Sequence, residues 1–250
     1  MAKRVRLDRA ISKLGLASRS EARRLITAGK VLVGGRQIVD PATEVLPQQA
    51  DIRVDGRAVP PCHERTIILN KSRGVLVTRR DPEGRPTVFD LLGPDGPTLV
   101  AAGRLDMATT GLLLLTTDTQ LAEWLTNPAN GIIRRYVVTV RGALSDDSAN
   151  QMTHGIAGMR AAAVRVRKRS TRETHLLVDL TEGKNREIRR LCEALGHEVT
   201  ALKRIAFGSL GLGDLQPGEW RDVTREEVAQ LRTTERQASP TRIRSTTLKR

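Results

Sequence analysis

The sequence predicts an α+β protein, in which a small N-terminal domain precedes a larger domain built on a mixed, mostly antiparallel sheet. Segments that alternate apolar and polar residues outnumber segments with the 3.6-residue period of an amphipathic helix. The two kinds of segment do not alternate regularly, as they would in a parallel α/β fold. The chain has 250 residues, 39% of them hydrophobic, which is enough for one or two packed cores.

Two helices and a hairpin are expected at the N-terminus. Apolar residues at i, i+3, i+4 and i+7 predict the first helix: Leu7, Ala10, Ile11 and Leu14. Ser18 and Glu21 form a capping box that opens a second helix, and Gly29 fits its end. Gly34 and Gly35, flanked by β-branched residues, suit the two-residue turn of a hairpin. A further short strand is expected in DIRVDG.

The second domain is expected to contain several strands and a few helices. Strands are predicted at 67–70, 75–78, 98–103, 111–117, 134–141, 163–169 and 175–183. Helices are predicted at 119–125, at 186–196, and from a capping box of Thr224 and Glu227 to about Leu231. The predicted boundaries are residues 3–57 and 66–235 for the domains, a linker at 58–65, and a basic, disordered tail at 236–250.

Composition narrows the classes of function. A net charge of +14 and a pI near 11.0 favour a polyanionic partner, with nucleic acid ahead of a membrane surface. Two distant cysteines fit a reducing cytoplasm. Together with four scattered histidines, they give no zinc-ligand spacing. No apolar run reaches the ~18–20 residues of a membrane span. Phosphate-binding, dinucleotide and nucleophile-elbow motifs are missing, so neither a metal nor a cofactor is expected.

The positive charge is concentrated at the N-terminus. Residues 1–36 hold ten Lys or Arg against two acidic residues. This pattern has two interpretations, a solvated charged surface or a face that contacts nucleic acid, and the near absence of interleaved acids favours the second. The candidate RNA-binding residues are Arg6, Arg9, Lys13, Arg19, Arg23, Arg24 and Lys30.

The same stretch resembles a known RNA-binding domain. RLDRAISKLGLASRSEARRLITAGKVLVGGRQIVDP is similar to the S-four (S4) type of domain, which is named after a ribosomal protein, over roughly its full length. The resemblance implies that the basic faces of the two helices meet structured RNA. Because this domain occurs on many RNA-acting proteins, it implies no particular chemistry.

One aspartate in the second domain needs an explanation. Asp106 stands in AAGRLDMATTGLLLLTTD, where a short polar turn separates two apolar segments. A carboxylate buried there needs a partner. From the residues alone, two interpretations stay open: an aspartate that stabilises a tight turn, or a catalytic carboxylate with a buried counter-charge.

A second resemblance favours the catalytic interpretation. GRLDMATTGLLLLTTD is similar to the catalytic motif of pseudouridine synthases, in particular the group that modifies ribosomal RNA and often carries an S4-type domain. Three further segments occur in the order expected for the family: NKSRGVLVTRRDPEGRPTVFDLL, RRYVVTV and LTEGKNREIRRLCEALGHEVTALKRIAFGSLGLGDLQPGEWRDVT. RDPEGRPTVFDLL and EGKNREIRRL look most like the members that act on the large ribosomal subunit.

This resemblance implies a role for each matching residue. Asp106 would act as nucleophile or base, Tyr136 would stack on the target base and assist proton removal, and Arg189 would pair with the carboxylate. Leu202 would pack under the base, although it also fits a plain core position. Phosphate or substrate contacts are expected at Lys71, Arg104, Lys184, Arg186 and Lys203.

The implied activity is the isomerisation of a flipped uridine to pseudouridine, which needs no cofactor. The expected partner is ribosomal RNA of the large subunit (23S), or a ribosomal assembly intermediate, bound by a cytoplasmic monomer. A rival hypothesis is a non-catalytic RNA-binding or ribosome-assembly factor with the same fold. The basic N-terminus fits both hypotheses and does not separate them.

Overall fold

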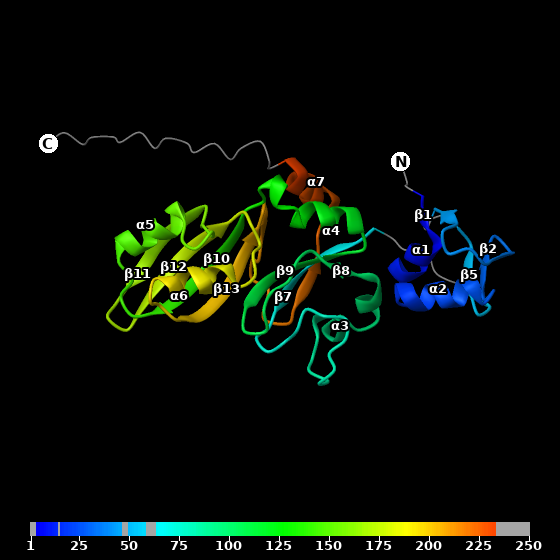
Figure 1. Cartoon of the computed structure of the whole chain (residues 1–250), viewed down its shortest axis with the longest axis horizontal. Coiled ribbons are helices and arrows are strands. Elements are labelled where there is room, and N and C mark those ends of the chain that lie inside the picture. Colours follow the sequence, from blue (N-terminus) through cyan, green and yellow to red (C-terminus); the bar gives the residue numbers. More distant parts are fainter. Residues whose placement is uncertain (1–3, 15, 47–49, 59–63, 234–250) are drawn as a thin grey trace.

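The structure is a computed structural model that describes residues 4–14, 16–46, 50–58 and 64–233. Figure 1 shows a small N-terminal part beside a much larger part that is organised around one long sheet. Most of the predicted linker (59–63) and the predicted tail (236–250) lie outside the described residues, so the domain boundaries stay a prediction. No helix in the described ranges is long and apolar enough to span a membrane.

The N-terminal part packs two helices on short strands. Its elements are β1 (Val5–Arg6), α1 (Leu7–Lys13), α2 (Arg19–Thr27), β2 (Val31–Val33), β3 (Arg36–Ile38), β4 (Glu44–Val45), β5 (Ile52–Val54) and β6 (Arg57–Ala58). Strands β3-β2-β5-β6 form one sheet, and β1 pairs with β4. The four apolar residues predicted for the first helix are all buried and share a core with Ala22 and Ile26 of α2.

The predicted turn, helix cap and helix end in this part are confirmed, although only the Ser18 half of the predicted capping box forms. Gly34 and Gly35 have φ values of +56° and +76°, as a type I′ turn requires, and they connect β2 to β3. The Ser18 hydroxyl accepts a hydrogen bond from the Glu21 N–H at 3.2 Å and so caps α2. Gly29, with φ +70°, follows the end of that helix.

The larger part is built on a mixed, mostly antiparallel sheet in the order β11-β12-β10-β13-β9-β7-β15. In it, β9 and β13 run parallel and the other pairs run antiparallel. The strands are β7 (Thr66–Lys71), β8 (Val100–Ala101), β9 (Thr110–Thr116), β10 (Arg134–Arg141), β11 (Ala163–Arg169), β12 (Glu173–Leu180), β13 (Val199–Phe207), β14 (Leu210–Gly211) and β15 (Trp220–Asp222).

The helices lie on both faces of this sheet, which explains the unbroken leucine run. They are α3 (Val88–Leu91), α4 (Thr119–Thr126), α5 (Asp146–His154), α6 (Glu187–Ala194) and α7 (Arg225–Thr233). Leu113 and Leu115 of β9 share a core with side chains of α3, α5 and α6. Leu112 and Leu114 point the other way, into a core with α4 and α7 (Figure 1). Because successive side chains of a strand alternate between faces, a strand covered on both sides must be apolar at every position.

Two predictions for the larger part need correction. No strand forms at 75–78, where only Leu76 makes an isolated bridge, to Thr87, and Val75 alone is buried. The strand predicted at 98–103 is limited to Val100–Ala101, because a 3-10 helix (Gly93–Thr98) occupies the preceding residues. The helix predicted from Thr119, the capping box of Thr224 and Glu227 with its helix, and the helix that begins at Glu187 are confirmed.

A close backbone contact joins the parallel strands. Gly111 of β9 pairs with Arg204 of β13 and has φ +99°. A β-carbon at this position would lie 2.2 Å from the Arg204 carbonyl oxygen and 2.9 Å from its nitrogen. Only glycine fits so close an approach at such a φ. The turn that carries Asp106 immediately precedes this contact, so the contact fixes that turn against β13.

Candidate active site

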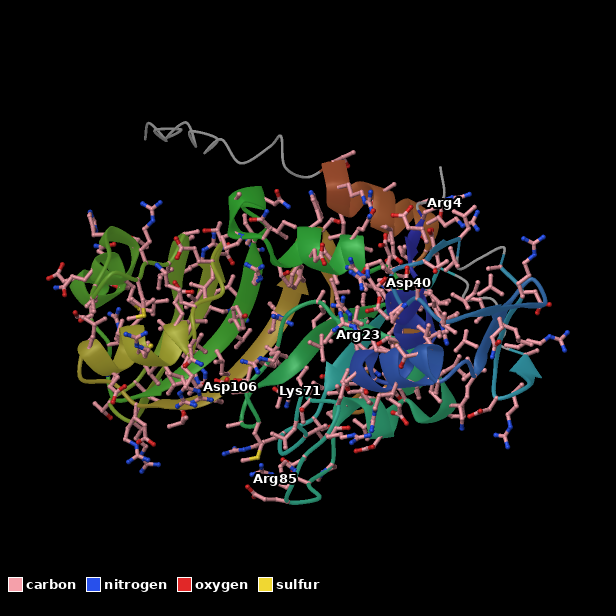
Figure 2. All side chains as sticks on the ribbon, turned by 45° about the vertical axis from the view of Figure 1, so that its right-hand side comes forward. Arg4, Arg23, Asp40, Lys71, Arg85 and Asp106 are labelled. Atoms are coloured by element: carbon pink, nitrogen blue, oxygen red, sulfur yellow. The ribbon has the colours of Figure 1, made fainter. Side chains whose placement is uncertain are left out.

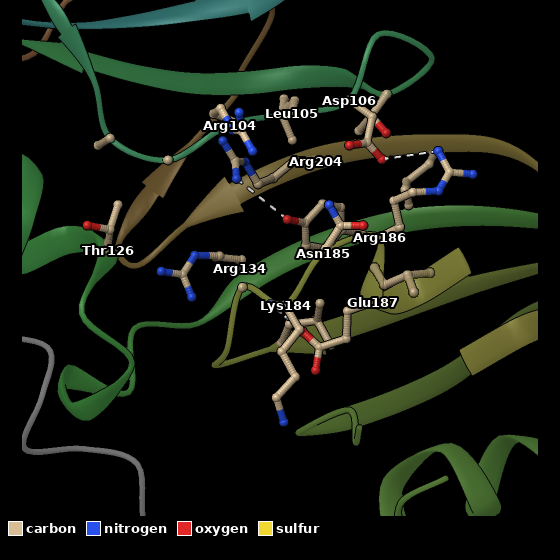
Figure 3. A pocket seen from close by; sticks show the side chains of 18 residues that line it. Arg104, Leu105, Asp106, Thr126, Arg134, Lys184, Asn185, Arg186, Glu187 and Arg204 are labelled. Carbon is tan, nitrogen blue, oxygen red and sulfur yellow. Dashed lines mark hydrogen bonds and ion pairs between the residues drawn. The ribbon is translucent and has the colours of Figure 1, made fainter. Parts of the chain in front are cut away.

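A cavity of about 310 Å³ opens where the turn before β9 and the strands β10 and β13 meet the N-terminal end of α6. It is lined by the turn of residues 102–109, the strand pair β10 and β13, the segment from Leu180 to Ile188, and Thr126 at the end of α4 (Figure 3). Among the side chains that line it are those of Asp106, Tyr136, Leu202 and Arg204, which the fold brings together from distant parts of the sequence.

Asp106 lies in the turn between β8 and β9. The Thr109 N–H donates a hydrogen bond to the Asp106 carbonyl oxygen at 3.0 Å, which closes the turn. The carboxylate is 38% exposed and faces the cavity, and its Oδ2 lies 3.7 Å from Arg186 Nη1. The carboxylate is therefore only partly buried, because the turn lies at the end of β9 and leaves the side chain open to the cavity.

The ion-pair partner of Asp106 is Arg186, and the predicted partner, Arg189, is not bonded to it. Arg186 is the residue before α6 and has a left-handed backbone, with φ +49° and ψ +34°. Figure 3 shows its side chain pointing from this turn toward Asp106. The Arg189 guanidinium instead donates to the Val199 carbonyl oxygen at 3.0 Å. The left-handed residue decides this outcome, because it turns the chain before the helix begins.

Arg189 nevertheless lies within electrostatic range of the site. Burial lowers the pKa of Arg189, the neighbouring charge of Arg186 lowers it further, and Asp106 acts in the opposite direction. The Nε atom of Arg189 is buried and has no hydrogen-bond partner among the described residues. Arg189 is therefore a neighbour of the carboxylate, held by β13.

Tyr136 and Leu202 lie on the same face of two paired strands. In the β10–β13 register, Tyr136 is opposite Arg204, and Val138 is opposite Leu202. Both Tyr136 and Leu202 are largely buried and line the cavity. The Tyr136 hydroxyl accepts a hydrogen bond from Arg204 Nη1 at 3.5 Å. The structure thus places the predicted tyrosine and leucine in one cavity with Asp106.

Two buried arginines of the cavity were not predicted from the sequence. Arg134 and Arg204 lie 5.0 and 5.2 Å from the centre of the Phe207 ring. Arg134 donates to four carbonyl oxygens, among them that of Thr181 at 2.8 Å and that of Leu125 at 3.0 Å. Burial lowers its pKa. The alternation of strand faces was an available signal, since Arg134 and Arg204 are each two residues from a predicted site residue.

Glu187 is a buried carboxyl group at the wall of the cavity, and it was also not predicted. Its Oε2 accepts a hydrogen bond from the Lys184 N–H at 3.2 Å, while Oε1 has no partner among the described residues. Burial raises the pKa of this carboxyl. Glu187 therefore braces the turn that precedes α6 and that carries Arg186.

The residues predicted to contact phosphate differ in whether they face the cavity and in whether their charges are paired. Arg104 is exposed at the cavity. Lys184 lines the cavity, but its ammonium pairs with Glu182 at 2.6 Å and donates to the Gly158 carbonyl oxygen at 2.8 Å. Lys203 does not face this cavity, because strand alternation directs it away from the face of Leu202 and Arg204.

Lys71 was predicted to contact phosphate, but its side chain is fully buried and its ammonium is bound by the protein itself. Its Nζ donates to the carbonyl oxygens of Ser72, at 2.9 Å, and Met107, at 3.4 Å. Burial lowers the pKa of Lys71 to about 8, although Asp106 opposes the shift. The ammonium therefore ties β7 to the turn that carries Asp106.

Part of the predicted basic surface of the N-terminal helices is engaged in ion pairs. Arg6 and Arg23 both pair with the buried Asp8, at 3.4 and 2.8 Å. The other pairs are Arg9 with Glu123 and Lys30 with Asp55. Arg19 and Arg24 are exposed, and the side chain of Lys13 lies outside the described residues. No three His, Cys, Asp or Glu in the described ranges are grouped so that they could hold a metal ion.

Comparison with known proteins identifies the class of this site. A sequence model of the RNA pseudouridylate synthase family matches residues 65–194, and a model of the S4 domain matches residues 5–51. The chain therefore belongs to the RNA pseudouridylate synthase family and carries an S4 domain at its N-terminal side. It is an isomerase that acts on RNA.

Individual relatives agree over most of the chain. An uncharacterised RNA pseudouridine synthase of Aquifex aeolicus is 35% identical over 232 residues, which cover 91% of this chain and 93% of the relative. The ribosomal large subunit pseudouridine synthase B of Yersinia pestis is 36% identical, with 91% and 75% covered. A crystal structure of a pseudouridylate synthase superposes with a TM-score of 0.62 at 26% identity, covering 91% of this chain and 99% of that one.

Proposed function

We propose that this protein converts one uridine of large-subunit (23S) ribosomal RNA to pseudouridine, with Asp106 carrying the reaction. The main support is that Asp106, Tyr136 and Leu202 converge on one cavity of about 310 Å³. That volume is at the lower end of the range for small-ligand sites and suits a single nucleotide. The relatives named for the large ribosomal subunit support the choice of RNA.

The reaction exchanges one bond of the ribose for another. The bond from C1′ to N1 breaks, the uracil turns, and a bond from C1′ to C5 forms, while C5 loses a proton and N1 gains one. Asp106 faces the cavity, where it can act as the nucleophile that frees the uracil or as a base. The Tyr136 ring stacks on the uracil, and its hydroxyl assists the removal of the C5 proton. Leu202 packs beneath the base. The ion pair with Arg186 holds the carboxylate in place.

The target uridine must leave its stacked position to reach Asp106. Flipping a nucleotide costs a few kcal/mol, which stacking in the cavity and phosphate contacts offset. Exposed Arg104 at the cavity and the basic residues of α1 and α2 supply such contacts, so binding falls steeply as salt rises. We propose that the enzyme acts as a cytoplasmic monomer on ribosomal RNA, either free or in an assembling particle.

The test maps pseudouridines in ribosomal RNA from cells with and without the gene, by chemical adducts that stop reverse transcriptase. We expect one large-subunit site to be lost and to return with wild-type protein. Asp106→Asn keeps the shape but removes the carboxylate, so it should not restore the site while folding and binding RNA like wild type. Restoration by this variant would refute the role of Asp106. An unchanged map would favour the rival hypothesis, a non-catalytic RNA-binding or ribosome-assembly factor.

A further inference from the structure

Arg204 has an unused hydrogen-bond donor inside the cavity. Its side chain is 2% exposed, and its Nε donates to the Leu112 carbonyl oxygen at 2.7 Å. Its Nη1 donates to the Tyr136 hydroxyl at 3.5 Å. Its Nη2 is buried and has no hydrogen-bond partner among the described residues. A buried charged donor without an acceptor is costly, which predicts that a ligand supplies the acceptor.

Arg204 also has no carboxylate partner in the described part of the chain. Among the other charged groups of the cavity wall, Arg186 pairs with Asp106, and Lys184 pairs with Glu182. Arg134 shares the Phe207 ring with Arg204 and adds a second buried positive charge. Glu187 acts electrostatically on Arg134, but neither guanidinium forms an ion pair among the described residues. Two buried guanidinium groups near one carboxyl group leave this end of the cavity electropositive, which favours an anionic ligand.

A second unpartnered donor lies close by. The Thr109 hydroxyl is buried, lines the same cavity and has no hydrogen-bond partner among the described residues. Thr109 lies two residues before Gly111, whose backbone touches that of Arg204. In the view of Figure 3, the Arg186 guanidinium lies on one side of Asp106 and the Arg204 side chain on the other. The cavity thus has an electropositive end at Arg134 and Arg204, separate from the ion pair of Asp106 and Arg186.

We propose that Arg204, together with the Thr109 hydroxyl, binds a phosphate oxygen of the nucleotide that enters the cavity. This inference rests on the proposed function, because it takes the ligand to be the target uridine in RNA. A guanidinium suits phosphate, since its N–H groups form short, charge-assisted hydrogen bonds to the oxygens. With a phosphate at the electropositive end, the glycosidic bond would be directed toward Asp106.

The test compares RNA fragments that span the mapped uridine and carry an uncharged methylphosphonate in place of its 5′ or its 3′ phosphate. For wild-type protein, kcat/KM on one of the two modified fragments should be about 10- to 100-fold lower than on the natural fragment. In Arg204→Met, the ratio of natural to modified kcat/KM at that position should fall to within about threefold of one. The position of the effect identifies which phosphate is bound.

The ratio separates binding from folding. A variant that folds poorly loses activity on both fragments equally, so its ratio stays at the wild-type value. Arg204→Lys is a second variant, which keeps the positive charge but lacks the planar guanidinium. Its ratio of natural to modified kcat/KM should be intermediate. Arg167→Met on β11, exposed and outside the cavity, is the matched control and should keep the wild-type ratio.

Two outcomes would overturn the inference. One is a wild-type enzyme that is indifferent to both modified phosphates, and the other is an Arg204→Met ratio equal to that of wild type. Failure of the proposed function gives a different result, since wild-type protein would then form no pseudouridine even in the natural fragment.

Discussion

Replacing Gly111 with alanine should strongly destabilise the larger part of the protein. Gly111 has φ +99°, and its backbone touches that of Arg204 where the parallel strands β9 and β13 meet. The added β-carbon would lie 2.2 Å from the Arg204 carbonyl oxygen, which is backbone and cannot rotate away. The substitution therefore forces either the strands apart or the turn of Asp106 out of position.

The size of the effect follows from two contributions. A positive φ costs a residue with a β-carbon about 1–2 kcal/mol. Overpacking against fixed atoms costs a further ~1–3 kcal/mol. The total of about 2–5 kcal/mol is a large share of the ~5–15 kcal/mol that stabilises a folded domain.

Urea unfolding followed by tryptophan fluorescence measures this loss. The chain has two tryptophans, Trp124 and Trp220, and both lie in the larger part, so the signal reports its unfolding. Gly74→Ala is the matched control: Gly74 has φ +86°, but a β-carbon there meets nothing within 4 Å. We expect Gly74→Ala to lose only the backbone contribution. If Gly111→Ala lost no more than this control, the proposed close contact would be refuted.

Two further predictions concern the charges around Asp106. Arg186→Gly removes the ion pair and a left-handed non-glycine residue together, so activity should fall about tenfold while the free energy of unfolding stays within about 1 kcal/mol of wild type. A larger loss of activity in Arg189→Met would instead support Arg189 as the partner of the carboxylate. Lys71 has a pKa of about 8 in the folded protein and 10.5 as its ordinary value, so the unfolded chain binds more protons between these pH values. The unfolding free energy of wild type, relative to Lys71→Met, should therefore rise by up to about 3 kcal/mol from pH 8 to 10.5 in urea titrations, and a flat difference would contradict the lowered pKa.

Much of the fold could be predicted because its signals are local. Helix caps such as Ser18 depend on residues within one turn, and the paired glycines at 34 and 35 specify their own hairpin. The strand predicted at 75–78 failed because its apolar residues have no neighbouring strand, and periodicity does not reveal which partners are available. The leucine run of β9 indicates burial on both faces, but the helices that cover each face depend on the topology.

The candidate site was predictable only where a motif marked a residue. Asp106, Tyr136 and Leu202 were found by resemblance, and the structure brings them into one cavity. The ion pair was assigned to the wrong arginine because it depends on one left-handed residue, Arg186, which spacing along a helix does not show. Arg204 lies in a segment covered by the resemblance but was given no role, although its position two residues after Leu202 on a strand was a usable signal.

Tyr136 is the single tyrosine of the chain, and it lines the cavity. The enzyme therefore contains its own spectroscopic reporter. In an NMR spectrum, one tyrosine ring spin system comes from this protein, and it comes from the place where the target base is proposed to stack. Binding of RNA, loss of Arg204 and a change in the Asp106 turn could each be followed on that one ring, without a label and without turnover.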